Sequence, residues 1–429
     1  MKRSAAILSL AFLLALICEP VLACTSAIFT GKSTPDGRPL MWKHRDTDEM
    51  NNIIAFFRGE KFNFVALTDA TYPPGTKKAW AGNNDVGFCI MNTASYNLKD
   101  DDVDEDLMVN AGKVMYRALE ICRTLADFEK FLDTLSRPMC VESNYGVIDA
   151  NGGAAYYEVC NYSWTKIDVN DPKIAPQGYL VYSNHSYTGR LNDGYGYVRY
   201  TNAENIIKSH IGRAGDITPD WIFKSLSRSF YHSLLDIDLV KENSVAGEGL
   251  LQRGSGWFID QDFIPRESTS SAMVFGGVKP GEDPLNTVMW TVLGYPPVSV
   301  AVPVFVKAGE NQPAFMVKRR NNNDAIMVEK GLEQNPEFAL MCDLALAVKA
   351  EVFPVKRGNG YKYYNFTLLH NPQGTGYMQK LAPVEAAIYR RGVELMKASM
   401  DKPYSKEQFD EYYKFVKNSI EEIYRELVR

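Results

Sequence analysis

Strand-like patterns surround one pair of helix-like patterns in the first 200 residues, and this order limits the fold more than any other feature of the chain. Short apolar or alternating runs between turn residues predict strands at 26–30, 39–46, 53–58, 62–69 and, as a pair, within 78–93. Apolar residues at helical spacing then predict two helices within 107–136. Strand patterns return at 146–148, 154–160 and 178–183. This order predicts an α+β fold and not an alternating βαβ fold.

The second half of the chain adds helix and strand patterns without a clear linker. We expect helices at 203–209 and 220–231, followed by strands at 270–275, 287–293 and 298–305. About the last 50 residues are helical again, with Ser405 and Gln408 spaced as in a capping box and one apolar seam from Phe409 to Leu427. Such a seam is more often a helix lying on its own domain than a coiled-coil dimer. The sequence therefore predicts one domain over 24–380 with packed C-terminal helices over 381–429.

The first 23 residues resemble a secretory leader. Lys2 and Arg3 precede an apolar run of about 13 residues, which is shorter than the roughly 20 residues of a membrane-spanning helix. Val21 and Ala23 are short residues that suit cleavage before Cys24. We expect removal of residues 1–23 and an exported protein, periplasmic or extracellular, without a stable membrane span. The alternative is a lipoprotein, in which an acylated Cys24 tethers the chain.

The composition of the chain limits which binding partners and bound metals can be expected. The formal net charge is −5 and no basic run occurs, so nucleic acid is not an expected partner. The cysteines after Cys24 are odd in number, widely spaced and without a C-x-x-C pair, so neither a disulfide framework nor a zinc site is indicated. The acidic run 100–106 lacks the spacing and glycine of a calcium loop. The sequence implies no metal and no cofactor, and it leaves a homo-oligomer open.

Cleavage before Cys24 would leave a thiol and a free α-amine on one residue. An α-amine titrates at about 7.7–8.0 and can take the thiol proton near neutral pH. A thiol that attacks an amide also needs a cation near the thiolate, an acceptor for the amine and donors for the oxyanion. Arg45 and Asp48, on the next predicted strand, are candidates for the first two roles. The alternative is that they form an ordinary ion pair at a strand edge.

These residues together resemble the opening of the linear amide C–N hydrolases of the N-terminal nucleophile superfamily. That group includes choloylglycine hydrolases, penicillin V acylases and isopenicillin-N acyltransferase-like proteins. The resemblance rests on Cys24-Thr-Ser, a Pro-Asp-Gly turn and Arg45-Asp-Thr-Asp48. It implies a four-layer αββα sandwich, to which this chain adds a C-terminal helical segment, and it implies that Cys24 is the nucleophile.

The resemblance also implies three further site residues. Asn92, which closes the strand after a Gly-Phe-Cys-Ile-Met run, matches the asparagine of the oxyanion hole. Asn184 in Tyr-Ser-Asn-His-Ser matches a second asparagine, and Arg199 matches an arginine beyond it, with Arg190 as the competing position. Asparagines also serve as turn residues that satisfy backbone groups, which is the other interpretation of both.

Two departures bear on the function. The gap from Cys24 to Arg45 is longer than in choloylglycine hydrolases, and Asp46 stands where asparagine is usual. Both favour the acyltransferase-like or dipeptidase-like branches. The resemblance thus implies a secreted cysteine amidohydrolase that opens a linear amide, in an N-acyl amino compound or a short peptide, through a Cys24 thioester. The alternative is a surface lipoprotein that keeps the fold as a binding module. Hydrolysis and acyl transfer both stay open.

Several aromatic residues lie in or beside the loops expected around the site. Either they form an acyl pocket or they belong to the core: Phe62, Phe64, Tyr72, Tyr96, Trp257 and Phe258. The expected partner is a small-molecule amide or a short peptide.

Overall fold

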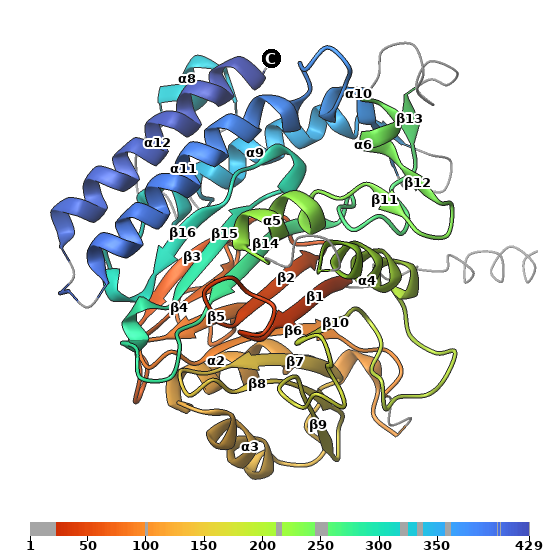
Figure 1. Ribbon diagram of the computed structural model, residues 1–429, viewed down its shortest axis with the longest axis vertical. Helices are drawn as coiled ribbons and strands as arrows, with labels where there is room; N and C mark the ends of the chain where they lie inside the picture. Colours follow the sequence, from red (N-terminus) through yellow and green to blue (C-terminus); the bar gives the residue numbers. More distant parts are fainter. Residues whose placement is uncertain are drawn as a thin grey trace, which may run out of the picture.

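The computed structural model places the chain in two large antiparallel sheets with helices on both sides (Figure 1). It describes residues 23–98, 102–211, 217–244, 256–317, 325–332, 338–356, 362–400, 402–403 and 405–428. Residues 1–22 of the expected leader lie outside these stretches, as do Asp100 and Asp101 of the acidic run. The predicted α+β class is confirmed.

One sheet contains seven strands in the order in which they occur along the chain. They are β3 (Asn52–Phe57), β4 (Phe64–Asp69), β5 (Ala81–Asn84), β6 (Cys89–Ala94), β7 (Ser143–Ile148), β8 (Ala154–Val159) and β9 (Trp164–Asp168). Every neighbouring pair is antiparallel. The pair predicted within 78–93 is β5 and β6, and their turn needs Gly87 because φ there is 79°. Helices α2 (Ala111–Ile121) and α3 (Leu125–Thr134) are inserted between β6 and β7.

The second sheet combines the beginning of the chain with segments far along it. Its order is β10 (Tyr179–Tyr182), β1 (Cys24–Phe29), β2 (Leu40–Asp46), β14 (Thr269–Gly276), β15 (Val288–Leu293) and β16 (Val302–Phe305). Strand β1 lies between β10 and β2, and all of its residues are buried. Cys24 is therefore the first residue of an inner strand of this sheet.

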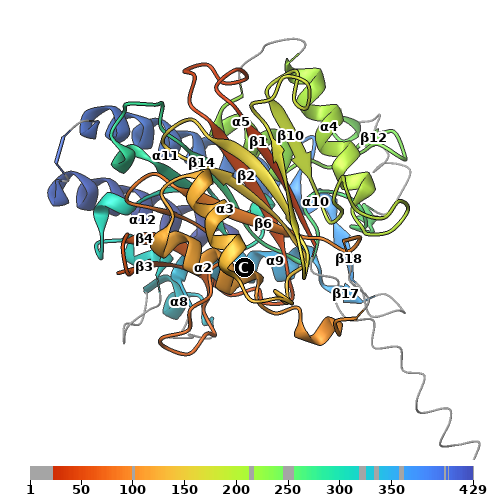
Figure 2. The same cartoon turned by 90° about the horizontal axis from the view of Figure 1, so that it is seen from below.

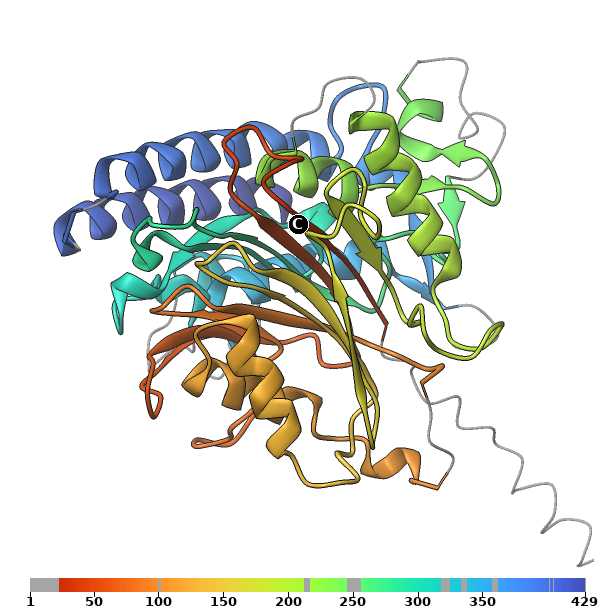
Figure 3. The same cartoon turned by 60° about the horizontal axis from the view of Figure 1, so that its bottom comes forward.

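The two sheets pack face to face between two groups of helices. Ser26 of β1 and Tyr156 of β8 join them through hydroxyl groups 3.0 Å apart. Figures 2 and 3 show α2 and α3 on the outer side of the seven-stranded sheet, where they share a separate apolar core with residues such as Phe64. The C-terminal helices α9 (Leu340–Val352), α11 (Tyr377–Ser399) and α12 (Lys406–Leu427) lie over the other sheet, as the blue ribbons in Figure 3 show.

The apolar seam of the C-terminal helix α12 contributes to the main core. Phe409, Val416, Ile420 and Leu427 of α12 are buried and belong to the main core cluster. Ser405 is the N-cap residue, but its side chain makes no capping hydrogen bond. The domain boundary predicted at residue 381 falls inside α11.

The helix predicted at 220–231 is shorter than expected. Helix α5 (Pro219–Ile222) continues into one π-helical turn, Phe223–Ser227, and Tyr231 already belongs to β11. Arg228 is the C-cap residue of this turn, and its buried guanidinium binds Glu385 of α11, with 2.6 Å between Nη2 and Oε1. Helix α4 (Tyr197–Ile211) follows β10, and the short elements are β11 (Tyr231–His232), β12 (Ile237–Asp238), α6 (Leu239–Glu242), β13 (Trp257–Phe258), α8 (Ala325–Glu329), β17 (Val355–Lys356), β18 (Lys362–Asn365) and α10 (Phe366–Leu369).

Candidate active site

Cys24 lies where the two sheets meet at one end of the sandwich. It pairs with Arg45 of β2, and 7% of its surface is exposed. Its backbone nitrogen donates to Asn184 Oδ1 at 2.9 Å. Ala23, just before the strand, is also bound to β2, since its carbonyl accepts from the Asp46 amide at 2.8 Å. The position that an α-amine would occupy after cleavage therefore faces a side-chain carbonyl.

Arg199 connects Cys24 to Asn184. Its Nη1 donates to the Cys24 carbonyl at 2.7 Å, and its Nη2 donates to Asn184 Oδ1 at 2.7 Å. Asn184 Nδ2 donates in turn to the Ala94 carbonyl at 2.9 Å, which fixes the orientation of the amide. Burial lowers the pKa of Arg199 to about 10, so it is cationic at neutral pH. Arg190, the competing position, is exposed and pairs with Asp193.

Arg45 is held by groups that the sequence did not point to. Its Nη2 lies 3.0 Å from Asp69 Oδ1, and its Nη1 donates to Asn52 Oδ1 at 2.6 Å. The guanidinium also stacks over Trp80, 4.9 Å from the ring centroid, and Trp80 Nε1 donates to Asp69 at 2.8 Å. Asp69 ends β4, and no motif in the sequence connects it to Arg45. The one indication in the sequence that Asp69 could belong to the site is its position at the end of a predicted strand.

Asp48, the predicted partner of the α-amine, makes no hydrogen bond with the Cys24 nitrogen. Strand β2 ends at Asp46, and the chain then leaves the sheet. The Asp48 side chain is exposed and accepts from Thr47 Oγ1 at 3.2 Å. Asn184 Oδ1 is the acceptor at the Cys24 nitrogen instead. Asn184, and not Asp48, is therefore the candidate acceptor for the α-amine of Cys24.

Asn92 is bound to a lysine that sequence reasoning missed. Lys43 Nζ donates to Asn92 Oδ1 at 2.8 Å and to the Trp80 carbonyl at 2.6 Å. Burial lowers the pKa of Lys43 to about 8. Alternation along β2 was the available signal, because residues two apart on a strand share a face and Lys43 therefore lies on the face of Arg45.

A buried glutamate anchors the loop that follows Asn184. Glu158, at 2% exposure, accepts from the Tyr182 hydroxyl at 2.8 Å and from the Thr188 amide at 3.0 Å, and it also accepts from the Tyr187 amide. These bonds tie residues on both sides of Asn184 to β8. The Glu158 carboxylate thereby helps to hold the loop that carries Asn184, together with the side-chain amides of Asn97 and Asn144.

Two tyrosines lie near the site, Tyr96 close to Cys24 and Tyr195 beside Asn184. The rings of Tyr96 and Tyr195 meet edge to face, 5.1 Å apart, and the Tyr195 amide donates to the Asn184 carbonyl at 3.1 Å. Burial raises the pKa of Tyr96, and negative charge at Cys24 raises it further. Of the candidate aromatics, Tyr96 thus lies at the site, whereas Phe64 is buried in the core under α2.

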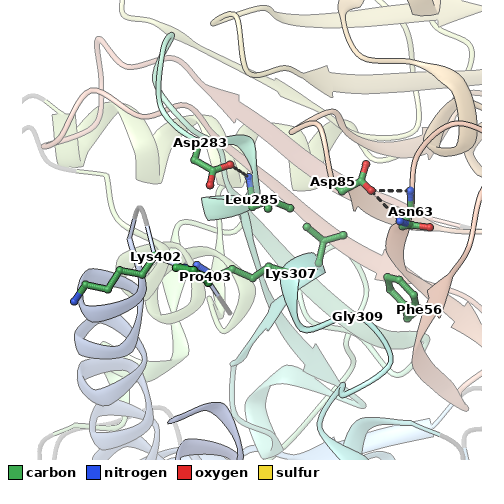
Figure 4. Close-up of a pocket in the computed structure, with 10 residues that line it drawn as sticks. Phe56, Asn63, Asp85, Asp283, Leu285, Lys307, Gly309, Lys402 and Pro403 are labelled. Atoms are coloured by element: carbon green, nitrogen blue, oxygen red, sulfur yellow. Dashed lines mark hydrogen bonds between the residues drawn. The ribbon is translucent and has the colours of Figure 1, made fainter. Parts of the chain in front are cut away.

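The surface cavity in Figure 4 belongs to the other end of the sandwich. It has a volume of about 440 Å³ and is lined by residues such as Phe56, Asp85 and Leu285. Leu285 lies in the connection that follows Gly276, which pairs with the start of β2, whereas Cys24 pairs near the end of β2. No predicted site residue lines this cavity.

The described part of the chain contains no group of three or more histidine, cysteine or acidic side chains that could hold a metal ion. Among the same residues, no helix has the length and apolar character needed to cross a bilayer.

Comparison with solved structures gives matches to N-terminal nucleophile hydrolases at low identity. An N-acylethanolamine-hydrolyzing acid amidase orthologue from Caenorhabditis elegans is 16% identical, with a TM-score of 0.37 over 59% of this chain and 92% of that chain. A variant of a conjugated bile acid hydrolase from Clostridium perfringens is 12% identical, with a TM-score of 0.37 over 63% of this chain and 89% of that one. A penicillin V acylase from Agrobacterium tumefaciens is 11% identical, with a TM-score of 0.36 over 66% and 86% of the two chains. No protein-family model matches the sequence, and no curated protein does. Similarity at this level assigns this chain no activity, substrate or residue role.

Proposed function

We propose that the chain is an exported amidohydrolase of the N-terminal nucleophile type, with the four-layer fold of that group, in which Cys24 opens a linear amide through a thioester. The observation that carries the proposal is the bond from the Cys24 nitrogen to Asn184 Oδ1 at 2.9 Å. It gives a free α-amine at position 24 a ready acceptor. The side chains of Arg45 and Arg199 bring positive charge to the same end of β1.

The α-amine of Cys24 is the base in this mechanism. It takes the thiol proton, and the thiolate attacks the amide carbon to form a tetrahedral oxyanion. The resulting α-ammonium then gives its proton to the leaving amine as the C–N bond breaks. Water, deprotonated by the same amine, hydrolyses the thioester, which releases the acid and restores the thiol.

The neighbouring residues take distinct roles. Asn184 Oδ1 holds the α-amine, and Arg199 holds Asn184 and the Cys24 carbonyl. Arg45, fixed by Asp69, favours the thiolate. Asn92 Nδ2 and backbone N–H groups stabilise the oxyanion.

The proposed substrate is an N-acyl amino compound or a short peptide. The edge-to-face pair of Tyr96, which interacts with Cys24, and Tyr195 supports contact with an apolar or aromatic acyl group. A panel of acyl amides, dipeptides and conjugated bile salts tests this choice. Cleavage of the bile salts alone would contradict it.

Two measurements test the reaction itself. N-terminal sequencing and intact mass of exported protein should give Cys24 as the free first residue. On that material Cys24→Ala should abolish turnover, while Cys160→Ala, which changes a half-exposed cysteine on the β8–β9 turn, should leave it unchanged. A diacylglyceryl mass increment on Cys24 would support the lipoprotein alternative, because a thioether sulfur cannot attack a carbonyl. Full activity of Cys24→Ala would end the proposal.

A further inference from the structure

Lys43 lies among the site residues and has no role in the mechanism above. It is 1% exposed and pairs with Ser26 in the register in which Arg45 pairs with Cys24. Residues two apart on a strand share a face, so Lys43 is the diagonal neighbour of Cys24 across the β1–β2 ladder. An ammonium buried at this position needs partners, and its partners are specific.

The hydrogen bond from Lys43 to Asn92 begins a series of bonds in which each donor and each acceptor is determined. Lys43 Nζ carries only donors, so the group that faces it at 2.8 Å must be the Asn92 carbonyl. Asn92 Nδ2 then points to Ser143 Oγ at 2.9 Å, and this hydroxyl donates onward to the Thr93 carbonyl at 3.1 Å. Because the Ser143 hydroxyl proton is used, its oxygen has to accept from Asn92. The whole chain of bonds fixes which end of the Asn92 amide donates.

The charges around Lys43 come from three strands. Cys24 of β1 and Asp69 of β4 favour its ammonium form, and Arg45 of β2 opposes it. Its neighbours on β6 and β14 are the neutral side chains of Asn92 and Met273. Across the β1–β2 ladder Cys24 thus has one cation directly opposite, Arg45, and a second on the diagonal, Lys43, and a cation beside a thiol favours the thiolate.

We propose that Lys43 is a positioning residue of the Cys24 site: its ammonium fixes the Asn92 amide with the Nδ2 end as donor and sets a positive charge beside the sulfur. The inference rests on the proposed function for its kinetic consequence, but the charge on the sulfur is measurable without a substrate. Burial lowers the pKa of Lys43 to about 8, so the positive charge is present at neutral pH and is lost as the pH rises through 8.

Two substitutions separate the two effects of Lys43. Lys43→Met removes both the donor and the charge, whereas Lys43→Gln keeps a donor for Asn92 Oδ1 without the charge. Lys307→Met is the matched control, because Lys307 is a half-buried lysine that binds Asn286 and Ser399 at the other end of the sandwich. All three are made in the mature chain that begins at Cys24.

The first readout is alkylation of Cys24 by iodoacetamide, followed by peptide mass spectrometry from pH 6 to 10. Cys140 and Cys160, both half-exposed, serve as references within the same molecule. In Lys43→Met and Lys43→Gln the midpoint of the Cys24 curve should move to higher pH, while the curves of the two reference cysteines stay in place. Equal Cys24 rates at every pH in the wild type and in both variants would overturn the charge effect, whether or not the chain cleaves amides.

The second readout is the kinetics with an amide that the wild type cleaves. Loss of an oxyanion donor lowers the rate by about 10²–10³-fold, so a disoriented Asn92 in Lys43→Met should lower kcat by about 10²-fold with a smaller change in KM. Lys43→Gln should recover part of that loss, and Lys307→Met should match the wild type. The alkaline fall of wild-type kcat near pH 8 should disappear in Lys43→Met. A kcat that Gln does not recover, together with an unchanged alkaline limb, would show that Lys43 only fills space.

Discussion

Replacing Lys43 by methionine should change how the stability of the protein depends on pH. The pKa of Lys43 falls from 10.5 to about 8 on burial, whereas in the unfolded chain it returns to its ordinary value. Between these two values the unfolded state binds more protons, so the free energy of unfolding rises with pH. Below about pH 8 the folded protein carries the full cost of the buried charge, which is about 3 kcal/mol at about 1.4 kcal/mol for each pH unit between the two pKa values.

Methionine has a similar length and no charge, so Lys43→Met should lack this dependence. The difference in unfolding free energy between wild type and Lys43→Met should therefore shift by about 3 kcal/mol toward the wild type from pH 7 to pH 10.5. The difference in unfolding free energy at pH 7 also includes the cost of the two acceptors that Lys43→Met leaves unpaired, Asn92 Oδ1 and the Trp80 carbonyl, at about 1–3 kcal/mol each. The test is therefore the change of this difference with pH. Urea unfolding at a series of pH values, followed by tryptophan fluorescence, measures it.

Lys349 provides a matched comparison for this experiment. It is a second buried lysine whose pKa burial lowers to about 8, and its neutral partners are the Met50 sulfur and two backbone carbonyls. Lys349→Met should give a similar slope. Stability differences that stay constant from pH 7 to pH 10.5 in both variants would refute the reasoning from burial.

Three further changes follow from the contacts of the site and its support. Glu158→Gln turns an amide NH₂ toward donors that need an acceptor, so unfolding free energy from urea titration should fall by about 1–3 kcal/mol and kcat should fall with it; an unchanged kcat would mean that the carboxylate does not hold the Asn184 loop. Gly196→Ala would set a Cβ 2.5 Å from Arg199 Nη2 at a φ of 80°, so kcat should drop at least tenfold, and steady-state kinetics at the wild-type level would contradict this. Glu385→Leu leaves the buried Arg228 guanidinium without its carboxylate and with only two backbone carbonyl acceptors, which should cost about 3–5 kcal/mol in thermal unfolding with Cys24 alkylation unaltered below the transition.

The sequence predicted the periodic elements of the fold well. Strands β5 and β6 and helices α2 and α3 follow from local patterns of apolar residues, which need no knowledge of tertiary contacts. The pairing of β1 with β10 and of β2 with β14 joins segments that are far apart in the sequence, and no local pattern specifies it. The helix predicted at 220–231 ends early, and the residue at its end, Arg228, forms an ion pair with Glu385, which is far away in the sequence; no local pattern specifies that contact either.

The contact between Arg45 and Cys24 could be predicted because the two residues lie on neighbouring strands that follow each other in the sequence. The register of β1 and β2 brings Arg45 beside Cys24, as the spacing of predicted strands suggested. Asp69 reaches Arg45 from β4 in the other sheet, and that contact depends on how two sheets pack. Asp48 stands three residues after Arg45 but beyond the end of β2, so its side chain turns to solvent.

The burial of Ala23 affects whether the predicted leader can be removed before or after the chain folds. Its surface is 1% exposed and its carbonyl is already paired with the Asp46 amide, so the peptide bond before Cys24 is covered in the folded chain. A processing peptidase needs an accessible, extended segment, and a folded chain of full length incubated with one should keep its mass. Under the proposed mechanism, a molecule that folds first would keep an amide where the base belongs. The rate of cleavage relative to the rate of folding, and not the fold alone, would then decide whether a given molecule becomes active.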